Sequence, residues 1–207
     1  IGLLIISIIS VSTSINIFIL VAACCFLGYL YQGPPFRLGY QGLGEPLCWL
    51  AFGPFAYSAV LIALNPSNIY FEDIPWKVSL LLGSGPSLAT TLVLFCSHFH
   101  QISEDKKHGK NSPLVRLGAK KGSQFVPWII FTIYIFQLFT IVYGFIPVFC
   151  ILYLLSFPQA IRLINLLKSS YAKPSAIKNC KFVAIKFQTL NGIGLITGLI
   201  FNYLLNK

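Results

Sequence analysis

The chain has 207 residues, of which 56% are hydrophobic and only 10% are charged, and its formal net charge is +10. Soluble globular domains carry about 25% charged residues, so this composition excludes an ordinary soluble protein and indicates a polytopic membrane protein. The positive charge does not point to nucleic acid, because the cations lie in short loops between apolar segments.

Five windows contain no Asp, Glu, Lys or Arg, and they predict membrane-spanning helices. They are residues 1–36, 46–71, 78–103, 122–161 and 187–206. A helix needs about 20 residues to cross a hydrocarbon core of about 30 Å, so the first and fourth windows are long enough for two helices each. The predicted fold class is all-α: one domain over residues 1–207, a polytopic membrane helix bundle with about seven transmembrane segments.

The first window starts with a short apolar segment, residues 1–11, before a polar break. It covers only about half of a bilayer, and the sequence contains no Met. We therefore expect an N-terminal part of the bundle to precede Ile1. Residues 15–31 then make a complete crossing.

The loop that follows, residues 31–45, reads YQGPPFRLGYQGLGE. Pro34 and Pro35 cannot continue a helix, and the four glycines permit a compact loop that could approach a ligand. The loop also places Arg37 and three aromatic residues at the membrane rim. Its composition fits an interfacial turn as well as a ligand-binding loop. Beyond it, Gly53-Pro54 interrupts the next helix, which indicates close helix packing or a ligand cavity.

The polar loop around residues 65–75 is expected to be a solvated turn on the opposite side of the membrane. The helix after it leads into residues 98–118, HFHQISEDKKHGKNSPLVRLG, where carboxylates, imidazoles and many cations meet. At about 3.6 residues per turn, Ser97, Gln101 and either Glu104 or Asp105 should share one helical face. An acidic pair could hold Mg²⁺ and the lysines could hold phosphate oxygens. A solvated basic loop and a transition-metal site that uses His98 and His100 are the alternatives.

Residues 122–161 predict two strongly aromatic helices joined by a tight turn near residues 144–147. The aromatic side chains either face lipid or line a cavity that holds an isoprenoid. If successive helices cross the membrane in alternating directions, every Lys and Arg except Lys77 and Lys207 lies on the same side of the membrane as the 33–44 loop. An excess of Lys and Arg in the loops on one side is typical of the cytoplasmic side of membrane proteins.

The motifs at residues 31–45, 52–54, 98–105, 109–110 and 115–118 together resemble the UbiA superfamily of intramembrane aromatic prenyltransferases. More narrowly, they are similar to its cyanobacterial and plastid branch that acts on 1,4-dihydroxy-2-naphthoate. The resemblance covers essentially the whole chain and implies a nine-helix bundle in which two acidic motifs jointly hold Mg²⁺ and a prenyl diphosphate. The first motif would fall before Ile1. In the second, Gln101 occupies the first acidic position and Asp105 the second.

This resemblance implies transfer of a phytyl or polyprenyl group to the naphthoate ring with loss of its carboxylate, in phylloquinone or menaquinone synthesis. The implied partners are a prenyl or phytyl diphosphate, an aromatic naphthoate and the lipid bilayer of a plastid or of a cyanobacterium. Charge then suggests a role for each candidate residue. Asp105 and Glu104 are expected to bind the metal; Lys110, Arg116, Arg37 and Gln101 to bind the diphosphate; and Asp105, Tyr31 and Arg37 to act in catalysis. Tyr31 would stabilise the allylic cation, and Arg37 could instead bind the naphthoate carboxylate.

Two other interpretations remain open at this point. The acceptor could be homogentisate, a chlorophyllide or haem. A non-enzymatic transporter or lipid-binding bundle would also explain broken helices and basic loops.

Overall fold

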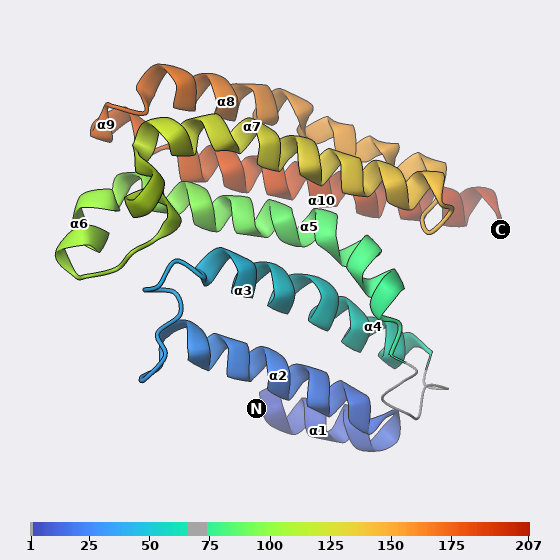
Figure 1. Ribbon diagram of the computed structural model, residues 1–207. Helices are drawn as coiled ribbons and strands as arrows, with labels where there is room; N and C mark the ends of the chain where they lie inside the picture. The colour runs from blue at the N-terminus through green and yellow to red at the C-terminus, as the bar shows by residue number, and fades with distance from the viewer. Residues whose placement is uncertain (1, 66–73) are drawn as a thin grey trace.

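The computed structural model describes residues 2–65 and 74–207, and within these residues the chain is helical without any strand (Figure 1). The helices, including π-helix η1 and 3₁₀ helices η3 and η4, are α1 Gly2–Ser12, α2 Ile15–Gln32, α3 Gly44–Leu50, η1 Ala51–Phe55, α4 Ala56–Leu64, α5 Trp76–Ser97, η3 His98–His100, α6 Ile102–Lys107, α7 Pro113–Val142, η4 Val148–Ser156, α8 Phe157–Ser170, α9 Pro174–Ile177 and α10 Cys180–Leu205.

Six helical segments in the described part of the chain are long and apolar enough to cross a membrane. They are Ile15–Gln32, Gly44–Leu64, Trp76–His100, Pro113–Val142, Val148–Ser170 and Cys180–Leu205. These segments match the six complete crossings predicted from the sequence, and the all-α membrane bundle is confirmed. Helix α1, with 11 residues, spans about half of a hydrocarbon core. Most of the predicted polar loop near residues 65–75 lies outside the described residues.

The loops predicted to be basic lie at one end of the bundle. In Figure 1 the 33–43 loop, α6 and α9 are together at the left, and the C-terminus and the turn between α7 and η4 are at the right. The left end includes Arg37, Lys106, Lys107, Lys110, Lys173 and Lys178. The two basic loops therefore lie at the same end of the bundle, as predicted. The side of the membrane that this end faces stays a prediction.

Two clusters of buried apolar residues hold the bundle together. The larger cluster joins α5, η3, α7, α8, α9 and α10 and includes Leu92, Ile133, Leu163 and Phe187. The smaller cluster joins α2 and α4 through Ile17, Leu20 and Ile62. The five elements before α5, from α1 to α4, therefore form a group with its own small core, next to α5.

The predicted break at Gly53-Pro54 is a π-helical segment with non-helical dihedral angles at Gly53. A Cβ atom on Gly53 would lie 2.6 Å from Ser87 Oγ, so glycine allows α5 to approach closely. The neighbouring residues Ala51 and Phe52 line a cavity. The break thus serves both of the roles that the sequence left open.

The aromatic side chains of the α7–η4 hairpin mainly face outward. Phe131, Phe139, Tyr143, Phe145 and Phe149 are exposed on the bundle surface, where lipid would surround them. In contrast, Tyr134 packs against Tyr153, Phe157 and Phe187 inside the bundle. None of the aromatic residues of the α7–η4 hairpin is among the residues that line the apolar cavity described below.

Candidate active site

The loop after α2 folds back over the end of that helix and encloses the ring of Tyr31. Leu38 N–H donates to Leu30 O and Gly39 N–H donates to Tyr31 O, each at 2.9 Å. A Cβ atom on Gly39 would lie 3.1 Å from Tyr31 Cε2, and one on Gly44 would lie 2.7 Å from the same atom. Because only glycine leaves this space, the loop composition is explained by the packing of Tyr31.

A second contact region joins this loop to the start of α7. Asn111 N–H donates to Tyr40 O at 2.7 Å, and the Arg116 guanidinium donates to Gln41 O. Gly42 has φ +77°, and its Cα lies so close to Asn111 O that a side chain would not fit. The 33–43 loop and the segment before α7 are therefore fixed to each other, although more than 60 residues separate them.

Asp105, on α6, is the centre of a buried polar cluster. Its Oδ2 accepts a hydrogen bond from Ser112 Oγ at 2.9 Å and lies 3.1 Å from His98 Nδ1, and its Oδ1 lies 3.5 Å from Lys110 Nζ. Only 8% of the residue is exposed. A buried carboxylate needs such partners because it has lost its hydration. The structure therefore brings together two predicted site residues, Asp105 and Lys110.

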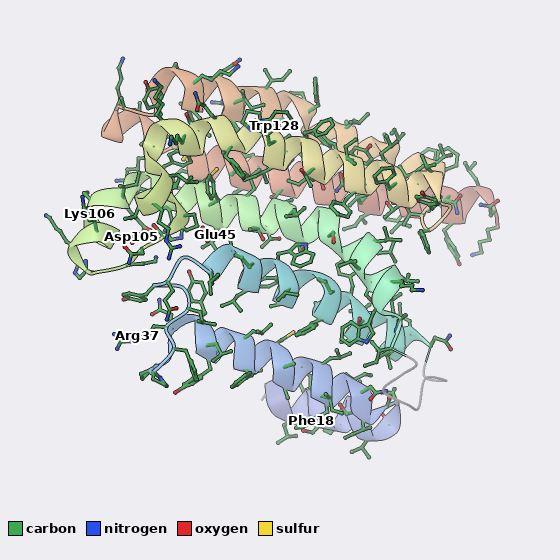
Figure 2. The ribbon with its side chains drawn as sticks, viewed as in Figure 1. Phe18, Arg37, Glu45, Asp105, Lys106 and Trp128 are labelled. Carbon is green, nitrogen blue, oxygen red and sulfur yellow. The ribbon has the colours of Figure 1, made fainter. Side chains whose placement is uncertain are left out.

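Glu45 joins this cluster from the first turn of α3. Its Oε1 lies 3.9 Å from His98 Nε2, so the buried His98 ring stands between two carboxylates, Glu45 and Asp105. Figure 2 shows Glu45 and Asp105 at the same end of the bundle. Glu45 Oε1 is buried and has no hydrogen-bond partner among the described residues. An unpaired carboxylate oxygen beside a second carboxylate is an available ligand for a cation.

Sequence reasoning missed Glu45 as a site residue. Its position as the last residue of the Gly-rich loop motif was the available signal. Its distance in sequence from Asp105 concealed their proximity, since only the folded bundle brings the start of α3 to the end of α5.

The single polar helical face predicted for Ser97, Gln101 and Glu104 or Asp105 is wrong. Helix α5 ends at Ser97, η3 follows, and Gln101 interrupts the chain before α6 with φ −105° and ψ 0°. This change of direction buries Asp105 and leaves Glu104 exposed. The segment nevertheless brings His98 Nδ1 to 3.1 Å from Asp105 Oδ2.

Four other predicted site residues lie outside the cluster around Asp105. The guanidinium of exposed Arg37 lies over the Tyr40 ring at 5.8 Å, and Figure 2 shows Arg37 on the far side of its loop from Asp105. Arg116 binds the loop carbonyl of Gln41. Within the described part of the chain, no ion pair joins Glu104 to a cation. Gln101 is half-buried between η3 and α6.

An apolar cavity of about 840 Å³ starts beside this cluster and extends into the bundle. Its walls come from α2, from α3 to α4, from α5 and from one residue of α10. The lining residues are Cys24, Cys25, Leu27, Gly28, Tyr31, Leu47, Cys48, Ala51, Phe52, Ala56, Thr90, Val93, Leu94, Ser97 and Gln188. The cavity is within the usual range of ligand pockets, about 300–1,000 Å³. Tyr31 and Ser97 mark its end nearest the polar cluster.

The donor atoms at this end fit a divalent ion that binds together with phosphate. Mg²⁺ in phosphate-transfer sites is usually held by one or two carboxylates and by substrate oxygens. Asp105 and Glu45 offer such carboxylates, with one buried oxygen of Glu45 unpaired. In the described residues, no group of three or more His, Cys, Asp or Glu side chains forms a metal cage by itself. The site therefore suits a metal that arrives with an anionic ligand.

Comparisons with known proteins agree with this geometry. Residues 1–185 match the model of the UbiA prenyltransferase family. The chain is 37% identical over 179 residues to the 2-carboxy-1,4-naphthoquinone phytyltransferase of Synechocystis sp.. This aligned region covers 86% of the chain and 56% of that protein. It is 38% identical over 191 residues to the chloroplastic 2-carboxy-1,4-naphthoquinone phytyltransferase of Arabidopsis thaliana. This second aligned region covers 91% of the chain and 50% of that protein. The chain thus spans about half the length of the curated relatives that it matches. No solved structure matches it.

Proposed function

The chain belongs to the UbiA prenyltransferase family, and from this membership we propose that it transfers a phytyl or other prenyl group from its diphosphate to an aromatic naphthoate. The proposed acceptor is 1,4-dihydroxy-2-naphthoate, the reduced form of the carboxylated naphthoquinone in the names of the two relatives. The reaction would belong to phylloquinone or menaquinone synthesis in a plastid or cyanobacterial membrane.

The observation that supports this proposal best is the position of the apolar cavity. It starts at Tyr31 and Ser97, next to the cluster of Glu45, His98, Asp105 and Lys110. A prenyl diphosphate has the same division, with an anionic head and an apolar tail. The head would lie at the end of the bundle among Lys110 and the carboxylates, and the tail would lie in the cavity.

Ionisation of the substrate would occur at the polar end of the cavity. The allylic C–O bond breaks, and its electron pair leaves with the diphosphate. Lys110 would bind the leaving oxygens, and its ion pair with Asp105 holds the ammonium in place. The UbiA family generally depends on a divalent metal, and we propose that this metal is Mg²⁺, held by Asp105 together with oxygens of the diphosphate, where it would supply positive charge to stabilise the leaving group.

Tyr31 and the apolar walls would then protect the allylic cation. The Tyr31 ring lies at the boundary between the polar cluster and the cavity, where its face can stabilise a cation. The apolar lining excludes water that would otherwise capture the cation. The electron-rich ring of the naphthoate forms the new C–C bond at the carbon that carries the carboxylate. Carbon dioxide leaves as its bonding electrons return to the ring, so the step needs no proton acceptor.

The test compares Asp105→Asn with Lys107→Gln in the same loop. Because the chain covers about half of its relatives, it would replace the aligned segment of the Synechocystis protein in a chimera expressed in membranes. Asp105→Asn keeps the size of the side chain but removes a charge at the metal, and activity should fall by about 10–100-fold. Lys107 is exposed and outside the cluster, so Lys107→Gln should keep the parental rate.

The measurement is prenylated naphthoquinol formed per unit of inserted protein, over a range of Mg²⁺ concentrations. Near-parental rates in both variants would show that Asp105 lies in a solvated basic loop and that this loop is not a site of diphosphate ionisation. Absence of product in the parental chimera with naphthoate, but product with homogentisate, would instead change the acceptor.

A further inference from the structure

A second cavity, of about 440 Å³, lies in the groove between α5 and α10. Its lining residues are Pro86, Ala89, Thr90, Gln188, Thr189, Asn191, Gly192, Ile193 and Ile196. It shares only Thr90 and Gln188 with the apolar cavity that starts at Tyr31. These two residues therefore stand where the cavities meet.

The spacing along α5 shows that the cavities follow each other end to end. The first cavity uses Ser97, Leu94, Val93 and Thr90, and the second uses Thr90, Ala89 and Pro86. Steps of three and four residues keep all of these on one helical face. On α10 the second cavity continues from Gln188 to Ile196, away from the polar end of the bundle.

A hydrogen bond joins the two shared side chains across the junction. Gln188 Nε2 donates to Thr90 Oγ1 at 2.7 Å, and Thr90 Oγ1 donates to Pro86 O at 3.2 Å. The hydroxyl is thus oriented by its own helix and receives the amide from α10. Separating the pair would leave a polar amide without this partner between apolar walls, which opposes opening.

We propose that the Thr90–Gln188 hydrogen bond closes the far end of the prenyl cavity and limits the length of the prenyl chain. This inference rests on the proposed prenyl transfer. From Ser97 to Thr90 the cavity extends about 10 Å along α5, at about 1.5 Å per residue. Opening the junction would add the path from Gln188 to Ile196, about 12 Å along α10 by the same rise. The intact protein therefore favours shorter prenyl chains over long polyprenyl chains.

The experiment measures kcat/KM for phytyl diphosphate and for nonaprenyl diphosphate in the chimera described above. Gln188→Ala removes the amide and joins the two cavities, and the ratio of nonaprenyl to phytyl transfer should rise by about tenfold or more. Thr90→Val keeps the shape of residue 90 but removes the acceptor, and it should shift the ratio in the same direction. Thr90→Ser keeps the hydroxyl and should preserve the parental ratio.

Thr189→Ala is the matched control. It enlarges only the second cavity, since Thr189 does not line the first, and the hydrogen bond stays in place. The chain-length ratio should therefore not change. A shift as large as that of Gln188→Ala would show that cavity volume, rather than the junction, sets the length.

A labelling experiment supplies a readout that does not need turnover. Ile193→Cys places a thiol in the second cavity, and nonaprenyl diphosphate should protect it from a maleimide only when Gln188 is also Ala. Protection without Gln188→Ala would overturn the proposal, and so would an unchanged ratio in both junction variants, because the chain then passes the junction or leaves sideways. A parental chimera that transfers no prenyl group and binds no prenyl diphosphate would instead reject the proposed function.

Discussion

His98 determines how the two carboxylates of the candidate site coexist. One ring nitrogen faces Asp105 at 3.1 Å and the other faces Glu45 at 3.9 Å, and only 4% of the residue is exposed. Without an imidazole between them, two carboxylates would remain in a region with little water. His98 is thus a positioning residue: it acts on the proposed substrate only through Glu45 and Asp105.

His98→Leu should therefore lower stability by about 1–3 kcal/mol, because it removes a partner from two buried carboxylates. Replacing Glu45 by Gln in the same chain should restore part of this loss, since one unpaired charge disappears. The measurement is thermal unfolding in detergent of the single and double variants. His108→Leu is the control, because His108 is exposed and its ring is hydrogen-bonded to a backbone carbonyl, that of Glu104, outside the cluster. A double variant less stable than His98→Leu would contradict this account.

At this scale, the sequence predicted the residues with local signals. Asp105, Lys110 and His98 lie within 13 positions of each other in the 98–118 segment, so the short distance along the chain already placed them in one region. Glu45 could not be found in this way. The burial of Asp105 instead of Glu104 also depends on the break at Gln101, which no periodic pattern encodes.

Among the elements, α10 and η4 make the closest backbone contact. A Cβ atom on Gly194 would overlap Leu152 O, and one on Gly198 would lie 2.5 Å from Cys150 Cα. Membrane helices pack by van der Waals contact, and small residues allow it. Both glycines are therefore required by the neighbouring backbone, which cannot rotate away as a side chain would.

Gly194→Ala should destabilise the protein by about 1–3 kcal/mol through this overlap. Gly192→Ala, two residues earlier in the same helix, meets no atom within 4 Å and should be neutral or slightly stabilising, because Ala favours helix. Thermal unfolding of the two variants under identical detergent conditions makes the comparison. Equal effects would show that α10 does not rest on η4 as tightly as described.

The crossings could be predicted because charge-free windows of sufficient length have few alternatives in a membrane. The type of each helix and the kinks within helices could not be predicted. Val148–Ser156 is a 3₁₀ helix that lies against the Gly194 and Gly198 surface, and α7 includes a kink with φ +76° at Gly118. The 3₁₀ helix packs against α10, a segment that lies far away in the sequence.

For the whole molecule, the arrangement of loops predicts a single orientation. The 98–112 segment and the 171–179 segment lie at one end of the bundle, and Lys77 lies at the other (Figure 1). Single cysteine reporters at Lys107 and Lys173, in a background without native cysteines, should be labelled from the same side of sealed vesicles. A reporter at Lys77 should be labelled from the opposite side. Labelling of Lys107→Cys and Lys173→Cys from different sides would reject the six-crossing arrangement.

The contacts at the polar end also have a mechanical consequence. Of the helices from α5 onward, α5 makes the extensive contacts with α3, η1 and α4, so it resembles the axis of a hinge between two groups of helices. At one end of α5, three polar contacts connect the two groups of helices: His98–Glu45, Asn111–Tyr40 and Arg116–Gln41. Lengthening these pairs would widen the gap between Tyr31 on one group and Ser97 on the other, which together form the mouth of the cavity. The contacts that join the two groups of helices therefore lie at the same end of the bundle as the mouth of the cavity and the candidate site.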